Sequence, residues 1–171
     1  MKSIVIYSSL TGNTKQVAEA ITSVLPAGTP CVSMKALPSD LSSYNLVFAG
    51  FWVDKGTANK EARDVLGTLH NPHIALFATA GVPPQMAHAK ESLINAANCL
   101  PDGVEPVGTF ICQGKVDPKV IEMMYKMFPK GHSHGQSADR DARHKQAAVH
   151  PNEDDFKAAQ DFAQHILAKL D

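Results

Sequence analysis

Four hydroxyl side chains, a carboxamide and a glycine gather in one short stretch near the start of the chain. The stretch is Ser8-Ser9-Leu10-Thr11-Gly12-Asn13-Thr14, between the apolar run Ile4–Tyr7 and a helical pattern over Val17–Leu25. Glycine lets a ligand approach the backbone closely, and the first turn of a helix presents unpaired N–H groups with partial positive charge. A strand, a turn and a helix in this order suit a phosphate group, even without a cationic side chain.

Several common phosphate-binding motifs do not match this turn. The P-loop requires G-x-x-x-x-G-K-S/T and the dinucleotide fingerprint requires G-x-G-x-x-G, whereas the turn holds a single glycine. It also has no cysteine that could serve a phosphatase loop. The alternative that remains is a Ser/Thr-rich helix cap that binds nothing.

Ser9–Thr14 resembles the phosphate loop of the flavodoxins, S/T-x-T-G-x-T, at every position of the motif. The placement directly after the first expected strand agrees with that family. The resemblance implies FMN as the cofactor, with Ser8, Ser9, Leu10, Thr11, Gly12, Asn13 and Thr14 around its terminal phosphate. The flavin would supply the chemistry, so we expect no catalytic side chain.

The elements that must position this loop alternate between strands and helices. Apolar runs predict strands at about 3–8, 31–34, 46–50, 74–78 and 104–112, and helical periodicity predicts helices at about 13–25, 62–69, 86–97 and 156–170. This alternation predicts a single α/β domain over residues 1–171, with a five-stranded parallel sheet between two helical layers. The flavodoxin-like strand order 2-1-3-4-5 is the expected topology, and ligands then bind at the carboxyl ends of the strands.

Two further loops should reach the same edge. The first contains Phe51, Trp52, Val53 and Asp54, and Trp52 is suited to stacking on a flavin ring, although it could instead pack over the second helix. The second contains Thr79, Ala80 and Gly81, whose small side chains would leave backbone groups accessible to the ring edge. In the flavodoxin family these positions form the second and third flavin loops. The family's usual second stacking aromatic is missing from 79–83.

Val53 departs from the resemblance in a second way. In flavodoxins a glycine commonly follows the stacking residue, and its peptide flips when the flavin takes up one electron. A β-branched residue at positive φ costs on the order of 1–3 kcal/mol, which would favour two-electron use of the flavin. Alternatively, Asp54, Lys55 or Gly56 takes the turn, and Val53 is unstrained.

Residues 113–150 have no counterpart in the resemblance and should leave the last strand at the flavin edge. Asp117-Pro118 predicts the start of a short helix that carries Met123, Met124 and Met127. Its apolar side chains could line a site above the flavin, but packing on the body as core is the favoured interpretation. His132 and His134 form a His-x-His pattern, but no cysteine or carboxylate pattern accompanies it, so no metal is expected.

Composition restricts the possible partners. Sixteen Lys and Arg balance 17 Asp and Glu in a chain of 171 residues, which argues against nucleic acid as a partner. No apolar run approaches the roughly 20 residues of a membrane span. Three scattered cysteines suggest a cytoplasmic protein with reduced thiols. We expect a monomer or a weak dimer.

The sequence therefore predicts an FMN-binding, flavodoxin-like protein that transfers electrons to a redox partner protein or a small organic acceptor. One alternative is an FMN-dependent reductase of a quinone, a tetrapyrrole or another organic acceptor, with 113–150 as a lid. A flavin-free binding module is the other. The near-neutral charge differs from that of the strongly acidic classical flavodoxins, and this shifts weight toward a reductase or a dedicated partner.

Overall fold

The computed structural model describes residues 1–170. Its strands are β1 (Ser3–Tyr7), β2 (Cys31–Ser33), β3 (Leu46–Asp54), β4 (Thr57–Ala58), β5 (His73–Ala80) and β6 (Gly108–Gln113). Its α-helices are α1 (Asn13–Ser23), α2 (Lys60–Leu66), α3 (Ala87–Ala97), α4 (Pro118–Met127), α5 (Ala138–Ala147) and α6 (Glu153–Leu170), with a short 3-10 helix η1 (Met34–Ala36).

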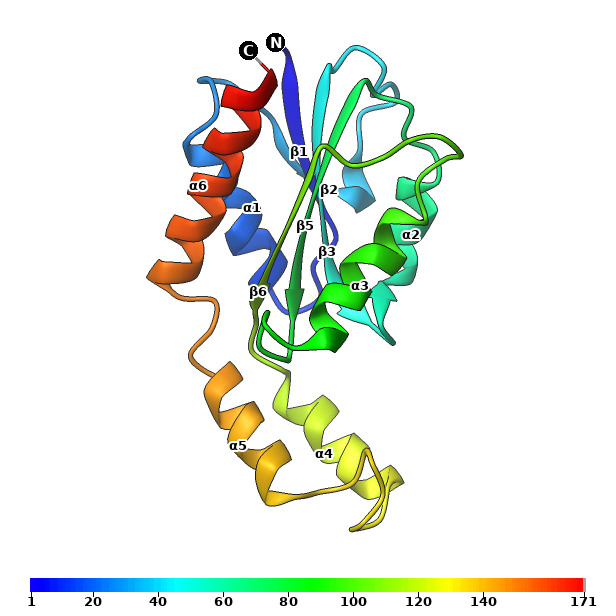
Figure 1. The fold of residues 1–171 in the computed structure, drawn as a ribbon, viewed down its shortest axis with the longest axis vertical. Coiled ribbons are helices and arrows are strands. Elements are labelled where there is room, and N and C mark those ends of the chain that lie inside the picture. Colours follow the sequence, from blue (N-terminus) through cyan, green and yellow to red (C-terminus); the bar gives the residue numbers. More distant parts are fainter. Residues whose placement is uncertain (171) are drawn as a thin grey trace.

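Five strands form the predicted parallel sheet, in the order β2-β1-β3-β5-β6 (Figure 1). One row of the register runs from Tyr7 through Gly50 and Phe77 to Phe110. The sheet has one strand more than predicted, because the two-residue β4 pairs antiparallel with the end of β3. The predicted α/β class and strand order are confirmed.

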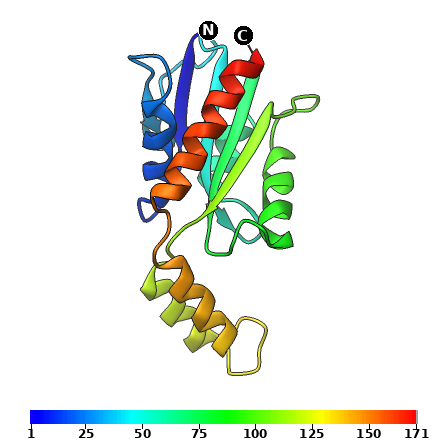
Figure 2. The same cartoon turned by 60° about the vertical axis from the view of Figure 1, so that its left-hand side comes forward.

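Helices cover both faces of the sheet (Figure 2). One face packs Phe48 and Phe77 against α1 and α6. The other packs Val47, Ala49 and Phe51 against α2 and α3. Consecutive residues of β3 thus serve opposite cores, as the two-residue period of a strand requires.

Gly50 gives the ring of Phe77 the room it occupies. A Cβ atom on Gly50 would lie 2.1 Å from Cζ of Phe77, a side chain with no exposed surface. Because such interiors are close-packed, the ring has little freedom to move aside. The missing side chain at Gly50 therefore lets the Phe77 ring lie against β3, close to the edge where the predicted loops lie.

The carboxyl ends of the strands meet at one edge, since all five strands run parallel. The segments at 8–12, 81–86 and 114–117 and the β3–β4 turn leave this edge, whereas the N-terminus and the end of α6 lie at the opposite one (Figure 1). The loops that the sequence singled out are therefore brought to one side of the molecule.

The segment that links β6 to α6 forms a pair of helices, α4 and α5, beyond the carboxyl edge (Figures 1 and 2). We call residues 113–150 the hairpin. The prediction that α4 packs on the body as core is wrong, because none of its residues is buried. The chain leaves β6 in the direction away from the sheet, and α6 already packs over β6 through Ile166 and Phe162 at Gly108.

None of the helices within residues 1–170 is long and apolar enough to cross a membrane.

Candidate functional site

The loop after β1 is shaped by Gly12, which occupies the N-cap position of α1 with φ 95° and ψ −13°. Only glycine adopts this left-handed conformation readily. Gly12 N–H donates to Ser9 Oγ at 3.1 Å, and Gly12 C=O accepts from Gln16 N–H at 3.0 Å. Within the described chain no side chain caps α1, and its first turn carries no acidic residue. The first amides of α1 and its dipole can therefore receive an anionic group.

Two of the loop hydroxyls are engaged inside the protein. Ser8 Oγ donates to Glu61 Oε2 at 2.5 Å and accepts from Asn59 Nδ2 at 2.8 Å. Thr14 Oγ1 lies 2.9 Å from Thr79 Oγ1, and both side chains are buried. These contacts tie the loop to α2 and β5, so the side chains of Ser8 and Thr14 hold the loop in place and are not free for a ligand.

Other loop residues remain open to a ligand. Thr11 is exposed, and Ser9 accepts from Gly12 N–H, which leaves the Ser9 hydroxyl proton free to donate. Leu10 at the tip is 67% exposed. Asn13 Nδ2 donates to Lys115 C=O at 2.8 Å and thereby ties the loop to the start of the hairpin.

The region after β3 is a strand and a tight turn where the sequence suggested a loop from Phe51 to Gly56. β3 continues to Asp54, and Val53 pairs with Ala58 of β4. Positive φ occurs at Lys55 (50°) and Gly56 (77°). Val53 is thus unstrained, which is the alternative in which the turn falls later in the chain. The antiparallel ladder holds Val53 extended, and the expected preference for two-electron use of the flavin stays a prediction.

Phe51 and Trp52 have different environments. Phe51 is completely buried in the core under α2 and α3, so it covers no ligand. Trp52 is only half-buried and, by strand alternation, points to the face that α1 covers. Its C=O accepts from Asn59 N–H at 3.1 Å, which fixes the backbone beneath the indole. Trp52 and the loop after β1 therefore flank the same corner of the carboxyl edge.

The third predicted segment, Thr79-Ala80-Gly81, lies at the carboxyl end of β5. Ala80 is almost completely buried, and its C=O accepts from Gly114 N–H at 2.8 Å. A Cβ on Gly81 would lie 2.5 Å from Val116 Cγ2. The backbone after β5 is therefore packed against the start of the hairpin.

Two residues near the site, Asn59 and Glu61, were not predicted from the sequence. Asn59 is 4% exposed, and its Oδ1 has no hydrogen-bond partner in the described part of the chain. An acceptor buried without a partner is costly, so a ligand donor reaching it would be favoured. Glu61 accepts the Ser8 proton and places a carboxylate beneath the loop. The sequence signal was an asparagine at a helix start with an acidic first turn, which usually indicates only capping.

A cavity of about 220 Å³ adjoins the loop after β1. Its lining includes Thr11 and Asn13 from the loop and Lys115, Asp117 and Pro118 from the start of the hairpin. Lys115 thus brings a cationic side chain beside a loop that has none of its own.

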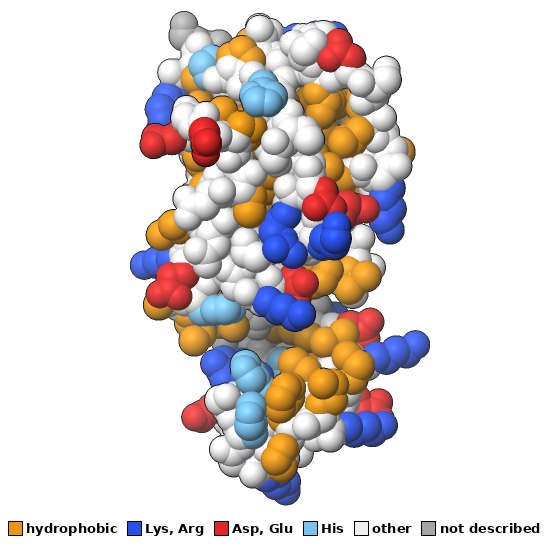
Figure 3. All heavy atoms as spheres, turned by 90° about the vertical axis from the view of Figure 1, so that its right-hand side faces the viewer, with side chains coloured by type: hydrophobic (Ala, Val, Ile, Leu, Met, Phe, Trp, Pro, Cys, Tyr) orange, Lys and Arg blue, Asp and Glu red, His pale blue; other side chains and the backbone are white. Residues whose placement is uncertain are grey.

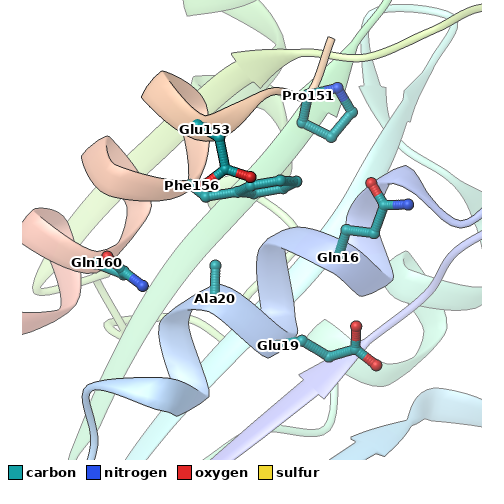
Figure 4. A pocket seen from close by; sticks show the side chains of 7 residues that line it. All are labelled: Gln16, Glu19, Ala20, Pro151, Glu153, Phe156 and Gln160. Atoms are coloured by element: carbon teal, nitrogen blue, oxygen red, sulfur yellow. The ribbon is translucent and has the colours of Figure 1, made fainter.

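A larger hollow, of about 430 Å³, lies between α1 and α6 (Figure 4). Gln16 and Glu19 project from α1, and Phe156 lies across from Ala20. The carboxylates of Glu19 and Glu153 make this hollow unsuitable for phosphate.

Three of the four histidines of the hairpin lie beside aromatic rings. The rings of Phe128 and His132 are stacked with centroids 4.7 Å apart, and His134 lies 5.4 Å from Phe128. His144 packs beside Tyr125, and burial together with Arg140 lowers the pKa of its imidazole. Across residues 1–170, no three His, Cys, Asp or Glu side chains gather as metal ligands.

The fold resembles that of solved flavoproteins. A flavoprotein from Lactobacillus acidophilus in complex with FMN superposes with a TM-score of 0.53 at 17% identity, over 65% of this chain and 93% of that one. Oxidised flavodoxin 2 from Bacillus cereus gives a TM-score of 0.52 at 14% identity, over 99% of both chains. These likenesses concern the fold alone.

Sequence comparison gives the family. The flavodoxin domain model matches residues 4–164. The flavodoxin-like domain-containing protein BilS of Clostridioides difficile is 34% identical, over 99% of this chain and 98% of its own length. BilS of Clostridium symbiosum is also 34% identical, over 95% of this chain and 94% of its own. The chain belongs to the flavodoxin family.

Proposed function

We propose that this chain binds FMN and uses it to pass electrons to a partner protein. The observation that carries the proposal is the glycine-capped start of α1, whose open amides lie at the same corner as Trp52. FMN is supported by the confirmed membership in the flavodoxin family and by the FMN bound to the L. acidophilus flavoprotein of the same fold.

The residues present fit this cofactor. The first amides of α1, with the hydroxyls of Ser9 and Thr11, would hold the terminal phosphate. The unpartnered Oδ1 of Asn59 offers an acceptor to a hydroxyl of the ligand. Trp52 would orient the ring. Bound FMN would supply the electron-transfer chemistry, and the protein would set its position and surroundings.

An electron carrier is favoured over a self-sufficient reductase by the shape of the hairpin. A lid should fold back over the loops that hold the cofactor, whereas α4 and α5 extend away from the carboxyl edge (Figure 1). Three free thiols, Cys31, Cys99 and Cys112, agree with a reducing cytoplasmic location, which forms part of the proposal together with a monomeric or weakly dimeric state.

Steady-state assays separate the two roles. The FMN-loaded protein is mixed with NADH or NADPH and with quinone or tetrapyrrole acceptors, with and without a flavodoxin reductase. A carrier should show turnover only when the reductase is added. Rapid oxidation of the nicotinamide by the protein alone would establish it as a reductase.

Trp52 should report FMN binding directly. A ring stacked on the chain's single tryptophan quenches indole emission, so adding FMN to the cofactor-free protein should remove most of its fluorescence. The quenching should saturate at one FMN per chain. Unchanged emission while FMN is bound, shown by equilibrium dialysis, would mean that Trp52 does not contact the ring.

A further inference from the structure

We infer that the outward face of α4 docks a partner protein whose own surface is apolar at its centre and acidic at its rim. The inference rests on the proposed function, because it names the kind of protein that would exchange electrons with the bound flavin. It starts from α4, a helix without a single buried residue.

An exposed apolar strip runs along α4. Met123 is 54% and Met127 is 65% exposed, and residues four apart lie one above the other on a helix. Methionine side chains are flexible and polarisable, so they adapt to a partner's surface. Neither methionine belongs to either core of the described chain. The strip therefore gains burial only by contact with another molecule.

A basic stripe adjoins the methionines. Lys119 continues the row of Met123 and Met127 at the start of α4, Lys126 lies beside that row, and Lys130 follows the end of the helix. The helix carries one acidic side chain, Glu122, whose Oε1 lies 2.6 Å from Lys126 Nζ in an exposed pair. Figure 3 shows hydrophobic side chains gathered on the hairpin, with Lys and Arg side chains at its margins.

Charge is divided between the two parts of the chain. The hairpin carries seven Lys and Arg against four Asp and Glu, whereas the rest carries nine against 13. An excess of positive charge beside an apolar strip is complementary to an acidic rim around an apolar centre. The expected partner is therefore acidic, whereas an acidic electron carrier docks to basic enzymes.

The base of the hairpin places this surface next to the proposed cofactor site. Lys115 C=O accepts from Asn13 of the phosphate loop, and Lys115 N–H donates to His150 C=O at 2.8 Å. Leu10, the exposed tip of the same loop, adds apolar surface at this edge. A protein docked on α4 would therefore lie beside the edge through which electrons leave.

The experiment reverses two charges on α4. In FMN-loaded, photoreduced protein, Lys119→Glu with Lys126→Glu is compared with the wild type by stopped-flow mixing with cytochrome b5, an acidic haem protein. The matched control is Lys2→Glu with Lys169→Glu, which changes the net charge equally at the opposite edge of the sheet. Basic cytochrome c and the neutral acceptor p-benzoquinone complete the set.

The expected result is a fall of at least about tenfold in the rate of cytochrome b5 reduction at low ionic strength, which added salt abolishes. The rate with cytochrome c should rise, and the rate with p-benzoquinone should stay the same. The control variant should reduce the acceptors at the same rates as the wild type. Replacing Met123 and Met127 with serine should also slow cytochrome b5 reduction, but independently of salt.

Three results would overturn the inference. Equal cytochrome b5 rates in the hairpin and control variants, with FMN bound and p-benzoquinone reduced, would refute the docking surface and leave the proposed function intact. A dimer in sedimentation that Met123→Ser with Met127→Ser dissociates would show that a second copy covers the strip. A wild type that binds no FMN would refute the proposed function, and the docking surface with it.

Discussion

Removing the hydroxyls of Ser9 and Thr11 together should lower the affinity for FMN by about two to four powers of ten. Each hydrogen bond to a charged phosphate contributes roughly 1.5–3 kcal/mol, and about 1.4 kcal/mol corresponds to a factor of ten. These two hydroxyls are the ones open to a ligand, since those of Ser8 and Thr14 are bonded inside the protein. The variant is Ser9→Ala with Thr11→Val.

The affinity follows from a fluorescence titration of the cofactor-free protein. Thr68→Val is the matched control, because its hydroxyl only caps Val65 C=O at the exposed end of α2. Thermal unfolding should be nearly unchanged in both variants, since neither substitution empties a core position. Equal affinities in the double variant and the wild type would mean that the phosphate lies elsewhere.

Replacing Gly50 with alanine should have the largest effect on stability. The added Cβ would overlap the buried Phe77 ring, so either the ring or the pairing of β3 with β5 must shift. Overpacking of this severity costs about 3 kcal/mol or more, and the midpoint of thermal unfolding should fall by roughly 6–12 °C. FMN affinity should fall as well, since β3 carries Trp52 to the site.

Gly67→Ala provides the comparison for Gly50→Ala. Gly67 has ordinary helical φ and ψ, and the nearest atom to a Cβ there is 3.6 Å away. Its substitution should leave the unfolding midpoint within a few degrees of the wild type. If both variants unfold at the same temperature, the contact between Gly50 and Phe77 does not limit the packing of the sheet.

The fold was predictable because its signals are local. Uninterrupted apolar runs gave the buried parallel strands, and the order of strands and helices left few topologies. The conformation of the loop after β1 was predictable for the same reason, since Ser9–Thr14 lies between a strand and a helix start. The surroundings of the other site residues were not predictable, because they depend on pairing between strands that are far apart in the sequence.

The end of β3 illustrates the limit. From the sequence, Phe51 and Trp52 were two aromatics at the start of a loop, because nothing marked how far β3 continues. Phe51 and Trp52 pair with Ala78 and Thr79 of β5, so alternation sends Phe51 into one core and leaves Trp52 on the other face. The pairing of β4 with the end of β3 places positive φ at Lys55 and Gly56.

The hairpin illustrates a second limit. A methionine-rich amphipathic helix is usually packed against its own protein, and α4 has that pattern. Whether a helix is covered depends on where the preceding strand ends and on what already covers the sheet. Similarly, the contacts of Ser8 with Asn59 and Glu61 join residues about fifty positions apart, which sequence spacing alone does not reveal.

Whether this chain holds FMN is decided by titrating the cofactor-free protein with FMN and with FAD. We expect saturable binding of one FMN per chain, with weaker binding of FAD, because the loop after β1 fits a terminal phosphate and the chain lacks a dinucleotide fingerprint. Absence of saturable FMN binding by the folded protein, or tighter binding of FAD, would contradict this expectation.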